Sequence, residues 1–433
     1  MYHFIGIKGT GMSALAIILK QLGYKVKGSD VDKHFFTESG LIKNNISFSE
    51  YSPSNIKKDY IIIKGASIKE DNVEVKRAKE LGCKIYLYNE MVGKLTKEYK
   101  TICVAGCHGK TTTTAMLAHV LGTVLGLNYL IGDGSGYANK NNNYFALESC
   151  EYKRHFLDYL PYYAIITNID LDHVDYYSDI DDVIDAYTSY ANKATKKVVA
   201  YGDDPYTRKM KLRKEVLFYG IEDNNDVYAT NIKYSDEGTS FDVIACGNLY
   251  GSFNLPVYGE GQLLDSLAVI SIAYLEEVDS STVNENFSSF IGAKRRFSQT
   301  IIGNSVVIDD YAHHPNEVKA TIDAIRQKYH GKKIVAIFQP HTFTRTKEFA
   351  SDLVDVFNTI DYTYVLDIHP AREKQEDYPN ITSSIIIDNL EHGEHIDIDE
   401  ANKLEKHRDS VYIFMSPNDI SGLEEDLKEI LRK

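Results

Sequence analysis

The sequence has few of the features that mark secreted, metal-stapled or membrane-spanning proteins. Its 433 residues include no tryptophan and only five cysteines, which are Cys83, Cys103, Cys107, Cys150 and Cys246. Because these cysteines are scattered and form no Cys-x-x-Cys pair, they argue against a disulfide framework or a zinc site and fit a reducing cytoplasm. No apolar run approaches the roughly 18 residues that span a membrane. A strand-like segment begins at Tyr2, so we expect no signal peptide.

Positive charge is also scarce. The chain has 48 lysines and arginines against 62 aspartates and glutamates, which gives a net charge of −14 and a pI near 5.5. This balance argues against nucleic acid or an anionic membrane as a partner. Basic residues that bind an anionic ligand should therefore be concentrated in a cleft. The chain also shows no internal repeat and no low-complexity tail, and nothing in it indicates an oligomeric state.

The pattern of elements predicts an α/β protein of about three domains, at roughly 150 residues each. Short β-rich runs alternate with helical patterns throughout, which is typical of mainly parallel sheets. We expect a Rossmann-like domain over 1–98, a central P-loop ATPase-type domain over 99–292 and a Rossmann-like domain over 293–433. Expected strands include 3–7, 24–28, 60–64 and 85–88 in the first unit, 101–105 in the second, and 305–308, 334–338, 362–366 and 411–414 in the third. Expected helices include 12–22, 73–81 and 263–275.

The most informative segment is the glycine-rich turn from Gly106 to Thr112. It follows an apolar run and opens a stretch in which apolar residues from Leu117 to Leu125 recur at helical spacing. Glycines let backbone N–H groups surround phosphate oxygens, and a helix N-terminus adds partial positive charge. Lys110 can reach terminal phosphates, and the Thr111 hydroxyl can bind Mg²⁺. Although Val104 replaces the first glycine of the full Walker pattern, the context favours a nucleoside triphosphate site over a solvated turn.

A second glycine cluster, Gly6 to Met12, lies between the first expected strand and helix. Asp30 ends the second strand about 20 residues later. The arrangement is similar to a Rossmann pyrophosphate turn, but its spacing is G-x-x-G-x-G rather than G-x-G-x-x-G. A tight βα turn that binds no ligand is an equally good interpretation of this cluster. If a nucleotide binds, the departure favours a ligand other than NAD, and a UDP-sugar would suit these amides and this carboxylate.

Glu148 and His173 each follow an expected strand of the central domain. The carboxyl ends of strands in open α/β sheets are where ligands collect, so these side chains could hold Mg²⁺ against nucleotide phosphates. One imidazole ligand is atypical for Mg²⁺, which prefers oxygen. The alternative is a surface histidine beside two solvated charges, Asp172 and Asp175.

Together these motifs resemble those of the Mur ligases, and among them the alanine-adding enzymes. The resemblance covers essentially the whole chain. Its motifs are 6–12, 106–112, 148–156, 167–173, 294–297, 309–315 with its His-His-Pro block, and 338–346 with its Gln-Pro-His block.

The resemblance implies a three-domain enzyme that binds a UDP-sugar, ATP and an amino acid in its successive domains. The implied UDP-sugar residues are Gly6, Gly9, Thr10, Gly11, Met12 and Asp30. The implied ATP residues are Gly106, Cys107, His108, Gly109, Lys110, Thr111, Thr112, Gln262, Asp265, Arg296 and Asp310. Mg²⁺ would be bound by Thr111, Glu148 and His173. The amino acid would contact Tyr311, His341 and Arg345. The implied catalytic residues are Lys110, Glu148, His173 and Arg296. For the C-terminal residues, the alternative is an ordinary strand-end turn.

The reaction implied by the resemblance joins L-alanine to the lactoyl carboxylate of UDP-N-acetylmuramate through an acyl phosphate, with ATP and Mg²⁺. It would be the first peptide-adding step of peptidoglycan precursor synthesis in the cytoplasm. Two alternatives stay open: another UDP-muramyl amide ligase, such as a murein-peptide ligase, and a non-catalytic UDP-sugar-binding paralogue. An NAD oxidoreductase is a weaker alternative because it leaves the second phosphate loop unexplained.

The sequence departs from the family pattern at three places. Cys107 replaces a threonine in the phosphate loop. Gly259–Asp265 stands where relatives have Gly-x-His-Asn-x-x-Asn, and we expect Asp265 to accept from the adenine amino group but not to donate to N7, as asparagine could. Ser416–Asp419 replaces a glycine-rich turn, where Pro417 removes an N–H donor. Residues 174–192 contain no lysine, so we expect no carbamoylated lysine after His173.

Overall fold

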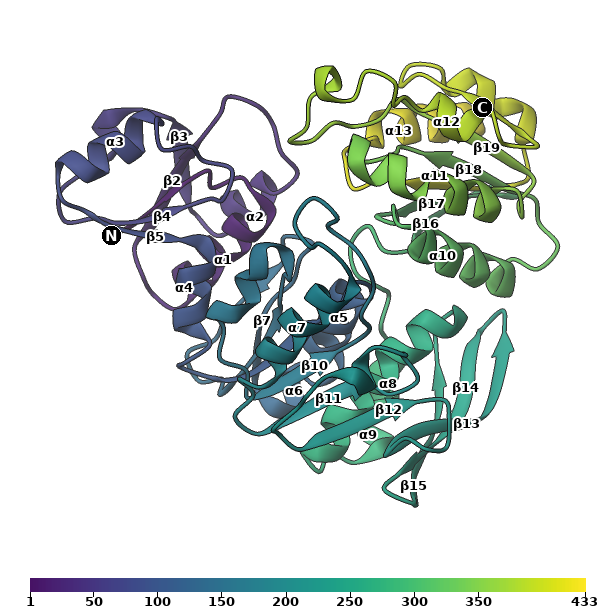
Figure 1. Cartoon of the computed structure of the whole chain (residues 1–433), viewed down its shortest axis with the longest axis horizontal. Coiled ribbons are helices and arrows are strands. Elements are labelled where there is room, and N and C mark those ends of the chain that lie inside the picture. The colour runs from purple at the N-terminus through teal and green to yellow at the C-terminus, as the bar shows by residue number, and fades with distance from the viewer.

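Three separate sheets, of five, ten and six strands, organise the chain in the computed structural model, which describes residues 1–433. In Figure 1 the N-terminal unit (purple) and the C-terminal unit (green to yellow) lie on opposite sides at the top, with the central unit (teal) below. The sheets are mainly parallel, which confirms the α/β fold class. No helix is both long enough and apolar enough to cross a membrane.

The N-terminal sheet has the strand order β3-β2-β1-β4-β5, and all its strands are parallel. This is the order of a Rossmann half, whose topological switch point lies between β1 and β4. The strands are β1 (Tyr2–Ile5), β2 (Val26–Asp30), β3 (Ser47–Glu50), β4 (Ile61–Lys64) and β5 (Lys84–Leu87). The helices are α1 (Thr10–Gln21), α2 (Glu38–Lys43), α3 (Val73–Glu80) and α4 (Tyr88–Leu95). Strand β2 begins two residues later than expected, because α1 ends through a turn at Gly23 (φ +90°).

The central sheet has the order β15-β14-β13-β12-β11-β10-β6-β9-β7-β8. Its strands are β6 (Lys100–Ala105), β7 (Leu127–Leu130), β8 (Gly136–Tyr137), β9 (Tyr144–Glu148), β10 (Tyr163–Ile166), β11 (Lys197–Tyr201), β12 (Val216–Gly220), β13 (Val227–Ser235), β14 (Gly238–Ala245) and β15 (Asn248–Leu255). Its helices are α5 (Lys110–Val120), α6 (Gly122–Leu125), α7 (Ile180–Ala191), α8 (Gly259–Leu275) and α9 (Ser280–Ser288). The helical pattern after the phosphate loop is thus divided between α5 and α6, and α8 begins four residues before the expected start.

The C-terminal sheet has the order β16-β17-β21-β18-β19-β20, and only β16 is antiparallel to its neighbour. Its strands are β16 (Ser298–Ile302), β17 (Ser305–Asp310), β18 (Ile334–Phe338), β19 (Tyr362–Val365), β20 (Gly393–His395) and β21 (Val411–Met415). Its helices are α10 (Pro315–Lys328), α11 (Phe343–Phe357), α12 (Ser384–Ile387) and α13 (Ser421–Leu431). Because the parallel strands end at one edge, the turns after β17 and β18 lie near each other, and both carry candidate site residues.

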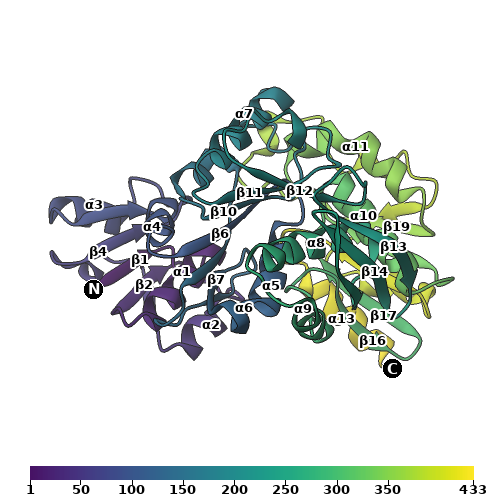
Figure 2. The same cartoon turned by 90° about the horizontal axis from the view of Figure 1, so that it is seen from below.

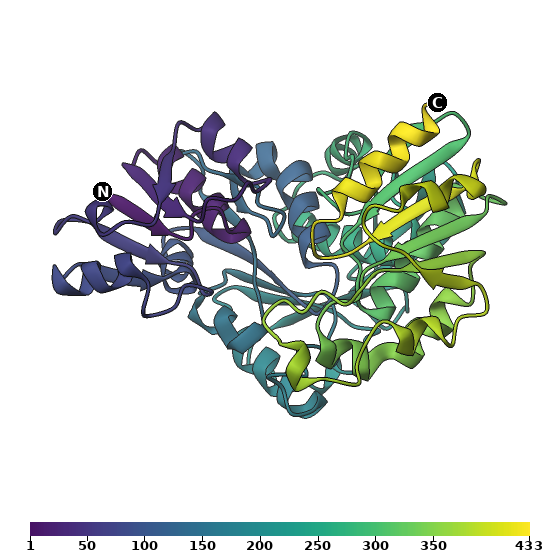
Figure 3. The ribbon, with the colours of Figure 1, turned by 90° about the horizontal axis from the view of Figure 1, so that it is seen from above.

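The three units are joined in two different ways. A single apolar core runs from the N-terminal unit into the central one and includes Leu15 of α1 and Phe145 of β9. Helix α1 packs closely on β8, where a side chain at Gly136 would clash with the backbone of Ala14. The two cores of the C-terminal unit, in contrast, take only Tyr258 from the central unit. Figures 2 and 3 show the same arrangement from below and above, with the central unit between the other two. The C-terminal unit is therefore held mainly by the polar contacts described next.

Candidate active site between the central and C-terminal domains

The phosphate loop has the expected strand–loop–helix form, running from β6 into α5. Gly106 (φ +148°) and Gly109 (φ +81°) have backbone conformations that favour glycine. A side chain at Gly106 would also clash with the Thr167 hydroxyl. The loop is pinned to the segment after β10, since the His108 N–H donates to the Asn168 side chain at 2.9 Å. The phosphate loop thus has a fixed backbone conformation at the N-terminus of α5, a position that stabilises a bound anion.

Lys110 lies folded over the loop. Its ammonium donates to the carbonyls of Gly106 at 2.5 Å and Cys107 at 3.1 Å, and forms an ion pair with Glu151 at 3.1 Å. Burial opposes the charge, but Glu151 outweighs it and raises the pKa of Lys110 above its usual value. Glu151 was missed among the candidate residues, although it stands only three positions after Glu148. The structure therefore presents a charged lysine whose partner is a protein carboxylate.

The candidate metal residues are only partly brought together. The Thr111 hydroxyl donates to Glu148 at 2.9 Å, and the Gly132 N–H donates to the same carboxylate at 2.7 Å. His173 lies instead beside Glu151, with 3.4 Å between its Nε2 and a carboxylate oxygen. The expected trio is thus a hydroxyl–carboxylate pair with a separate histidine next to it. The pair fits Mg²⁺, because hydroxyl and carboxylate oxygens are ligands this cation prefers.

A second group lies around His173. Glu151, Asp172 and His173 place one potential ligand atom each within 4.8 Å of the others. Glu151 is 3% exposed, and its pKa is held below the usual range because Lys110 and His173 outweigh its burial. His173 has φ +52°, which is strained for a residue with a side chain. Strain of this kind collects at functional sites, and it supports a role for His173 beside the phosphate loop.

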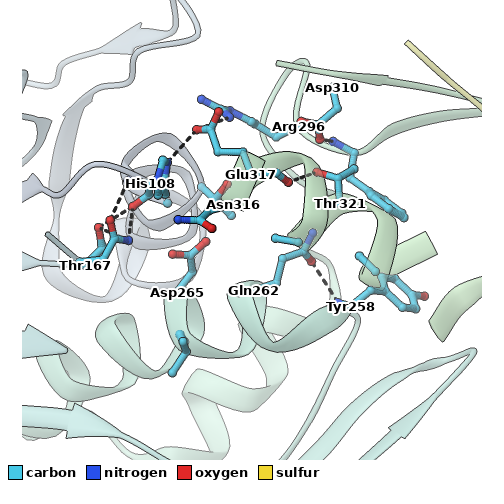
Figure 4. Close-up of a pocket in the computed structure, with 18 of the residues that line it drawn as sticks. His108, Thr167, Tyr258, Gln262, Asp265, Arg296, Asp310, Asn316, Glu317 and Thr321 are labelled. Carbon is cyan, nitrogen blue, oxygen red and sulfur yellow. Dashed lines mark hydrogen bonds and ion pairs between the residues drawn. The ribbon is translucent and has the colours of Figure 1, made fainter. Parts of the chain in front are cut away.

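A cavity of about 180 Å³ lies between α8 and α10, against the phosphate loop. Figure 4 shows Gln262 and Asp265 on α8 pointing toward Asn316 and Glu317 on α10. The structure gathers seven of the predicted ATP residues on its walls, namely His108, Gly109, Thr112, Gln262, Asp265, Arg296 and Asp310. These come from segments up to 202 residues apart in the sequence, which supports one shared ligand.

Two predicted ATP residues have chemistry that the sequence did not indicate. Asp265 accepts a hydrogen bond from the Thr113 hydroxyl at 2.9 Å, and burial raises its pKa to about 7. The expectation that Asp265 can only accept is therefore wrong, because near neutral pH part of the population is protonated and can donate. Cys107 points away from the cavity: its buried thiol donates to the Asp170 carbonyl at 3.1 Å. Its backbone N–H donates to the Asn168 carbonyl at 3.4 Å, so a phosphate would have to compete with that contact.

Arg296 and Asp310 reach the cavity from the C-terminal side. The Arg296 guanidinium lies over the Tyr311 ring, 4.9 Å from its centroid, and 3.9 Å from Glu317. Asp310 accepts from the N–H groups of Phe297 at 2.7 Å and Ala312 at 2.8 Å, and burial raises its pKa to about 6. Asp310 therefore holds a strand-end turn, the alternative considered above, and lines the cavity as well.

Two of the three predicted amino-acid residues are in direct contact. Arg345 donates to His341 Nδ1 at 3.2 Å and forms an ion pair with Asp172 of the central domain at 2.5 Å. Burial alone would raise the pKa of Asp172, but Arg345 holds it well below the usual range. Tyr311 lies further away and joins them through His313, whose ring is 5.8 Å from both Tyr311 and His341. Asp172 was treated as a solvated charge in one alternative, and that part of the alternative is wrong because Asp172 is paired with Arg345.

The N-terminal candidate residues fall into two groups. Gly6, Gly9 and Asp30 line a cavity of about 430 Å³ at the carboxyl end of the sheet. Asp30 also holds the glycine turn, since it accepts the N–H of Lys8 at 2.7 Å. The remaining residues, Thr10, Gly11 and Met12, do not line this cavity. They begin α1, where a Cβ on Gly11 would be 2.7 Å from the Tyr88 hydroxyl.

These features define a class: a three-domain α/β protein whose central domain carries a phosphate loop at a cavity shared with the C-terminal domain. Three family models match in chain order. The model described as Mur ligase family, catalytic domain, matches residues 1–100; the Mur ligase middle domain matches 104–273; and the Mur ligase, glutamate ligase domain, matches 295–417. The chain belongs to the Mur ligase family, which confirms the resemblance seen in its motifs.

Individual relatives agree over the full length. The chain is 44% identical to the UDP-N-acetylmuramate–L-alanine ligase of Lacticaseibacillus paracasei, over 99% of this chain and 98% of the relative. A UDP-N-acetylmuramate–alanine ligase structure from Thermotoga maritima has a TM-score of 0.81 at 26% identity, covering 99% and 98% of the two chains. A murein peptide ligase from Psychrobacter arcticus has a TM-score of 0.75 at 22% identity, covering 100% and 98%, and shows the same fold.

Proposed function

We propose that this chain is an ATP-dependent ligase that joins L-alanine to the lactoyl carboxylate of UDP-N-acetylmuramate. The observation that carries the proposal is the cavity where phosphate-loop residues meet Arg296 and Asp310 from the C-terminal side. The full-length identity of 44% to an enzyme named for this reaction supports the choice of substrates. The five free cysteines support a reducing compartment, so we place the enzyme in the cytoplasm.

The three domains would divide the substrates among them. The division at 1–98, 99–292 and 293–433 is supported by the three sheets and by family models that match 1–100, 104–273 and 295–417. The cavity beside Gly6, Gly9 and Asp30 would take the UDP-sugar. The cavity between α8 and α10 would take ATP, and the segment around His341 and Arg345 would take L-alanine.

The reaction has two steps. In the first, a lactoyl carboxylate oxygen attacks the γ-phosphorus of ATP, the bond to the β–γ bridging oxygen breaks, and ADP leaves. In the second, the alanine amine attacks the acyl carbon, the amide C–N bond forms, phosphate leaves, and the amine gives up a proton. Phosphorylation is needed because a carboxylate has no adequate leaving group.

The residues of the chain would lower the barrier mainly by electrostatics. Two anions must approach each other in the first step, so positive charge has to be in place beforehand. Lys110 of the phosphate loop and Arg296 on the wall of the cavity would supply it. Thr111 and Glu148 would hold Mg²⁺, with His173 next to them; bound there, Mg²⁺ neutralises phosphate charge.

Contacts between the central and C-terminal domains would exclude water from the acyl phosphate. Arg345 pairs with Asp172 at 2.5 Å, and the Asn316 amide donates to Asp170 at 2.6 Å. Arg372 pairs with Asp175 at 2.6 Å, which adds a further contact between the two domains beyond the phosphate loop. A sealed site matters because an acyl phosphate reacts readily with water.

The test is a phosphate-release assay with UDP-N-acetylmuramate and ATP, crossed against L-alanine, L-serine, glycine and a peptidoglycan tripeptide. We expect turnover with L-alanine above all, and none in Lys110→Ala, whose fold should be intact by circular dichroism. Preference for the tripeptide would indicate a murein-peptide ligase. No turnover with any acceptor would indicate a binding protein, and alanine-dependent ADP formation at the wild-type rate in Lys110→Ala would contradict the assignment of the loop.

A further inference from the structure

Glu317 lies where the C-terminal domain meets the phosphate loop. It is the third residue of α10, and one carboxylate oxygen accepts the N–H groups of His313 at 3.1 Å and His314 at 3.4 Å. This capping box satisfies two N–H groups at the start of the helix and turns the side chain back over it. The other carboxylate oxygen, Oε1, faces the central domain, as Figure 4 shows.

The carboxylate is surrounded by three basic side chains from different segments. Oε1 lies 3.3 Å from His108 Nδ1 and 3.9 Å from Arg296 Nη1, while Oε2 lies 3.3 Å from His313 Nδ1. The Glu317 side chain is 12% exposed. Burial alone would raise its pKa, but His313, His108 and Arg296 together hold it well below the usual range. Glu317 is therefore a buried anion at the meeting point of two domains.

His108 is the partner that connects Glu317 to the phosphate loop. Its other ring nitrogen, Nε2, is 3.3 Å from Asp170, so both nitrogens face carboxylates and both can donate. Burial opposes a charge on this ring, but the neighbouring carboxylates of Asp170 and Glu317 raise its pKa to about 9. The backbone is fixed as well, since the His108 carbonyl accepts from Thr167 at 2.5 Å and from Asn168 at 3.0 Å. The loop backbone is thus held by Thr167 and Asn168, while the ring lies between the carboxylates of Asp170 and Glu317.

We propose that Glu317 is a positioning residue for the phosphate loop. By binding His108 and Arg296 with one carboxylate, it fixes the position of the C-terminal domain relative to the loop, and so the positions at which the His108 and Arg296 side chains meet the nucleotide. Glu317 is an anion on the wall of the cavity proposed for ATP, so it acts on the anionic nucleotide through the two cations that it binds. The proposal rests on the proposed function, because it concerns how the proposed ATP site is aligned. Other contacts across the boundary, such as Arg345 with Asp172, bring the domains together without touching the loop.

The chain offers a matched control for the test. Glu317→Gln keeps the size of the side chain and an amide oxygen that can cap α10, but it removes the charge. Glu90 occupies the same capping position in α4, where it is exposed and accepts the Leu87 N–H at 2.8 Å. Glu90→Gln therefore reproduces the change in a capping box without the link to the loop. Glu317→Gln should lose more thermal stability than Glu90→Gln, because it leaves the buried His108 and Arg296 side chains without their carboxylate.

The measurement is the Kd of the full-length protein for Mg-ADP by calorimetry, in a double-mutant cycle with His108→Gln. We expect Glu317→Gln and His108→Gln each to weaken binding about tenfold, and the double variant to bind no more weakly than the weaker single variant. Glu90→Gln should bind like wild type. Because a purely structural cap would not couple to His108, this coupling is specific to the proposed role.

Three results would count against the proposal. Glu317→Gln that binds Mg-ADP as well as Glu90→Gln would overturn it, and so would single effects that simply multiply in the double variant. Wild-type protein that fails to bind Mg-ADP would overturn the proposed function together with this role. Tight wild-type binding without coupling would overturn the role of Glu317 alone, so the two failures are distinguishable.

Discussion

Replacing Asp265 by asparagine should remove a pH-dependent loss of stability from the central domain. Asp265 is 8% exposed, and the donor to its carboxylate is the Thr113 hydroxyl at 2.9 Å. Burial raises its pKa to about 7, with Thr113 and the charge of Arg296 acting only weakly in the opposite direction. In the unfolded chain the same group has a pKa of about 3.9. The fold therefore favours the protonated form.

The sign and size of the effect follow from this difference. A raised pKa in the folded state contributes stability at acid pH, and this contribution is lost as the pH rises through 7. Between pH 5 and pH 8, the wild-type protein should lose about 2.5 kcal/mol from this group. The asparagine does not titrate, and its amide oxygen can still accept from Thr113. The free energy of unfolding of Asp265→Asn, relative to wild type, should therefore rise by that amount over the same range.

The assay is urea unfolding without nucleotide at pH 5, 6, 7 and 8, for wild type, Asp265→Asn and the control Asp242→Asn. Ser252 and Asn231 donate to Asp242 and lower its pKa, so Asp242 stays ionised across this range and its replacement should leave the pH profile unchanged. Profiles of wild type and Asp265→Asn that run parallel from pH 5 to pH 8 would refute the reasoning.

Three further predictions concern the candidate metal and amino-acid residues. Gly132→Ala should weaken Mg²⁺-dependent nucleotide binding about tenfold, because the new methyl group displaces the Glu148 carboxylate. The melting temperature should stay nearly unchanged, since that carboxylate is flexible. Unchanged nucleotide affinity in calorimetry would contradict this prediction. Removing Mg²⁺ with EDTA should abolish phosphate release, and adding Mg²⁺ back should restore it. Persistent turnover without Mg²⁺ would exclude a role of Thr111 and Glu148 in metal binding. Arg345→Lys should raise the KM for L-alanine about tenfold or more, since a single ammonium cannot bind Asp172 and a second carboxylate with two separate nitrogens; an unchanged KM in steady-state assays would count against that contact.

The parts of the fold that could be predicted are those whose signal is local. A strand followed by Gly106–Lys110 and a run of threonines predicts a phosphate loop, because glycine conformation and helix start are set by neighbouring residues. Most strand positions agree with the structure within two residues for the same reason. The exception after the loop is also local. The apolar period continues past Leu121, yet α5 ends at Val120 and α6 follows as a separate turn closed by Gly126 (φ +65°).

The parts that could not be predicted depend on contacts between distant segments. Asp172 meets Arg345 across 173 positions of sequence, and His108 meets Glu317 across more than 200. Nothing near either residue indicates which partner the tertiary fold will bring to it. The titration of Asp265 was missed for a related reason, since burial at the interface of α5 and α8 is what raises its pKa. Sequence motifs thus named residues of the site, while the ion pairs that link the two domains came only from the structure.

Ion pairs at the candidate site, within and between the domains, explain how a chain with net charge −14 can hold a site for anionic ligands. Lys110 is matched by Glu151 at 3.1 Å and Arg345 by Asp172 at 2.5 Å, so the cations are neutralised before any ligand arrives. An entering phosphate or carboxylate must therefore displace or share an anionic partner, which reduces the binding free energy but leaves the cations in place for the reaction. Discrimination must then come from geometry, because only a ligand whose oxygens replace the carboxylate at the same distance compensates for separating the existing pair. A surface rich in positive charge is unnecessary in such a site, which is why the overall composition gives no sign of it.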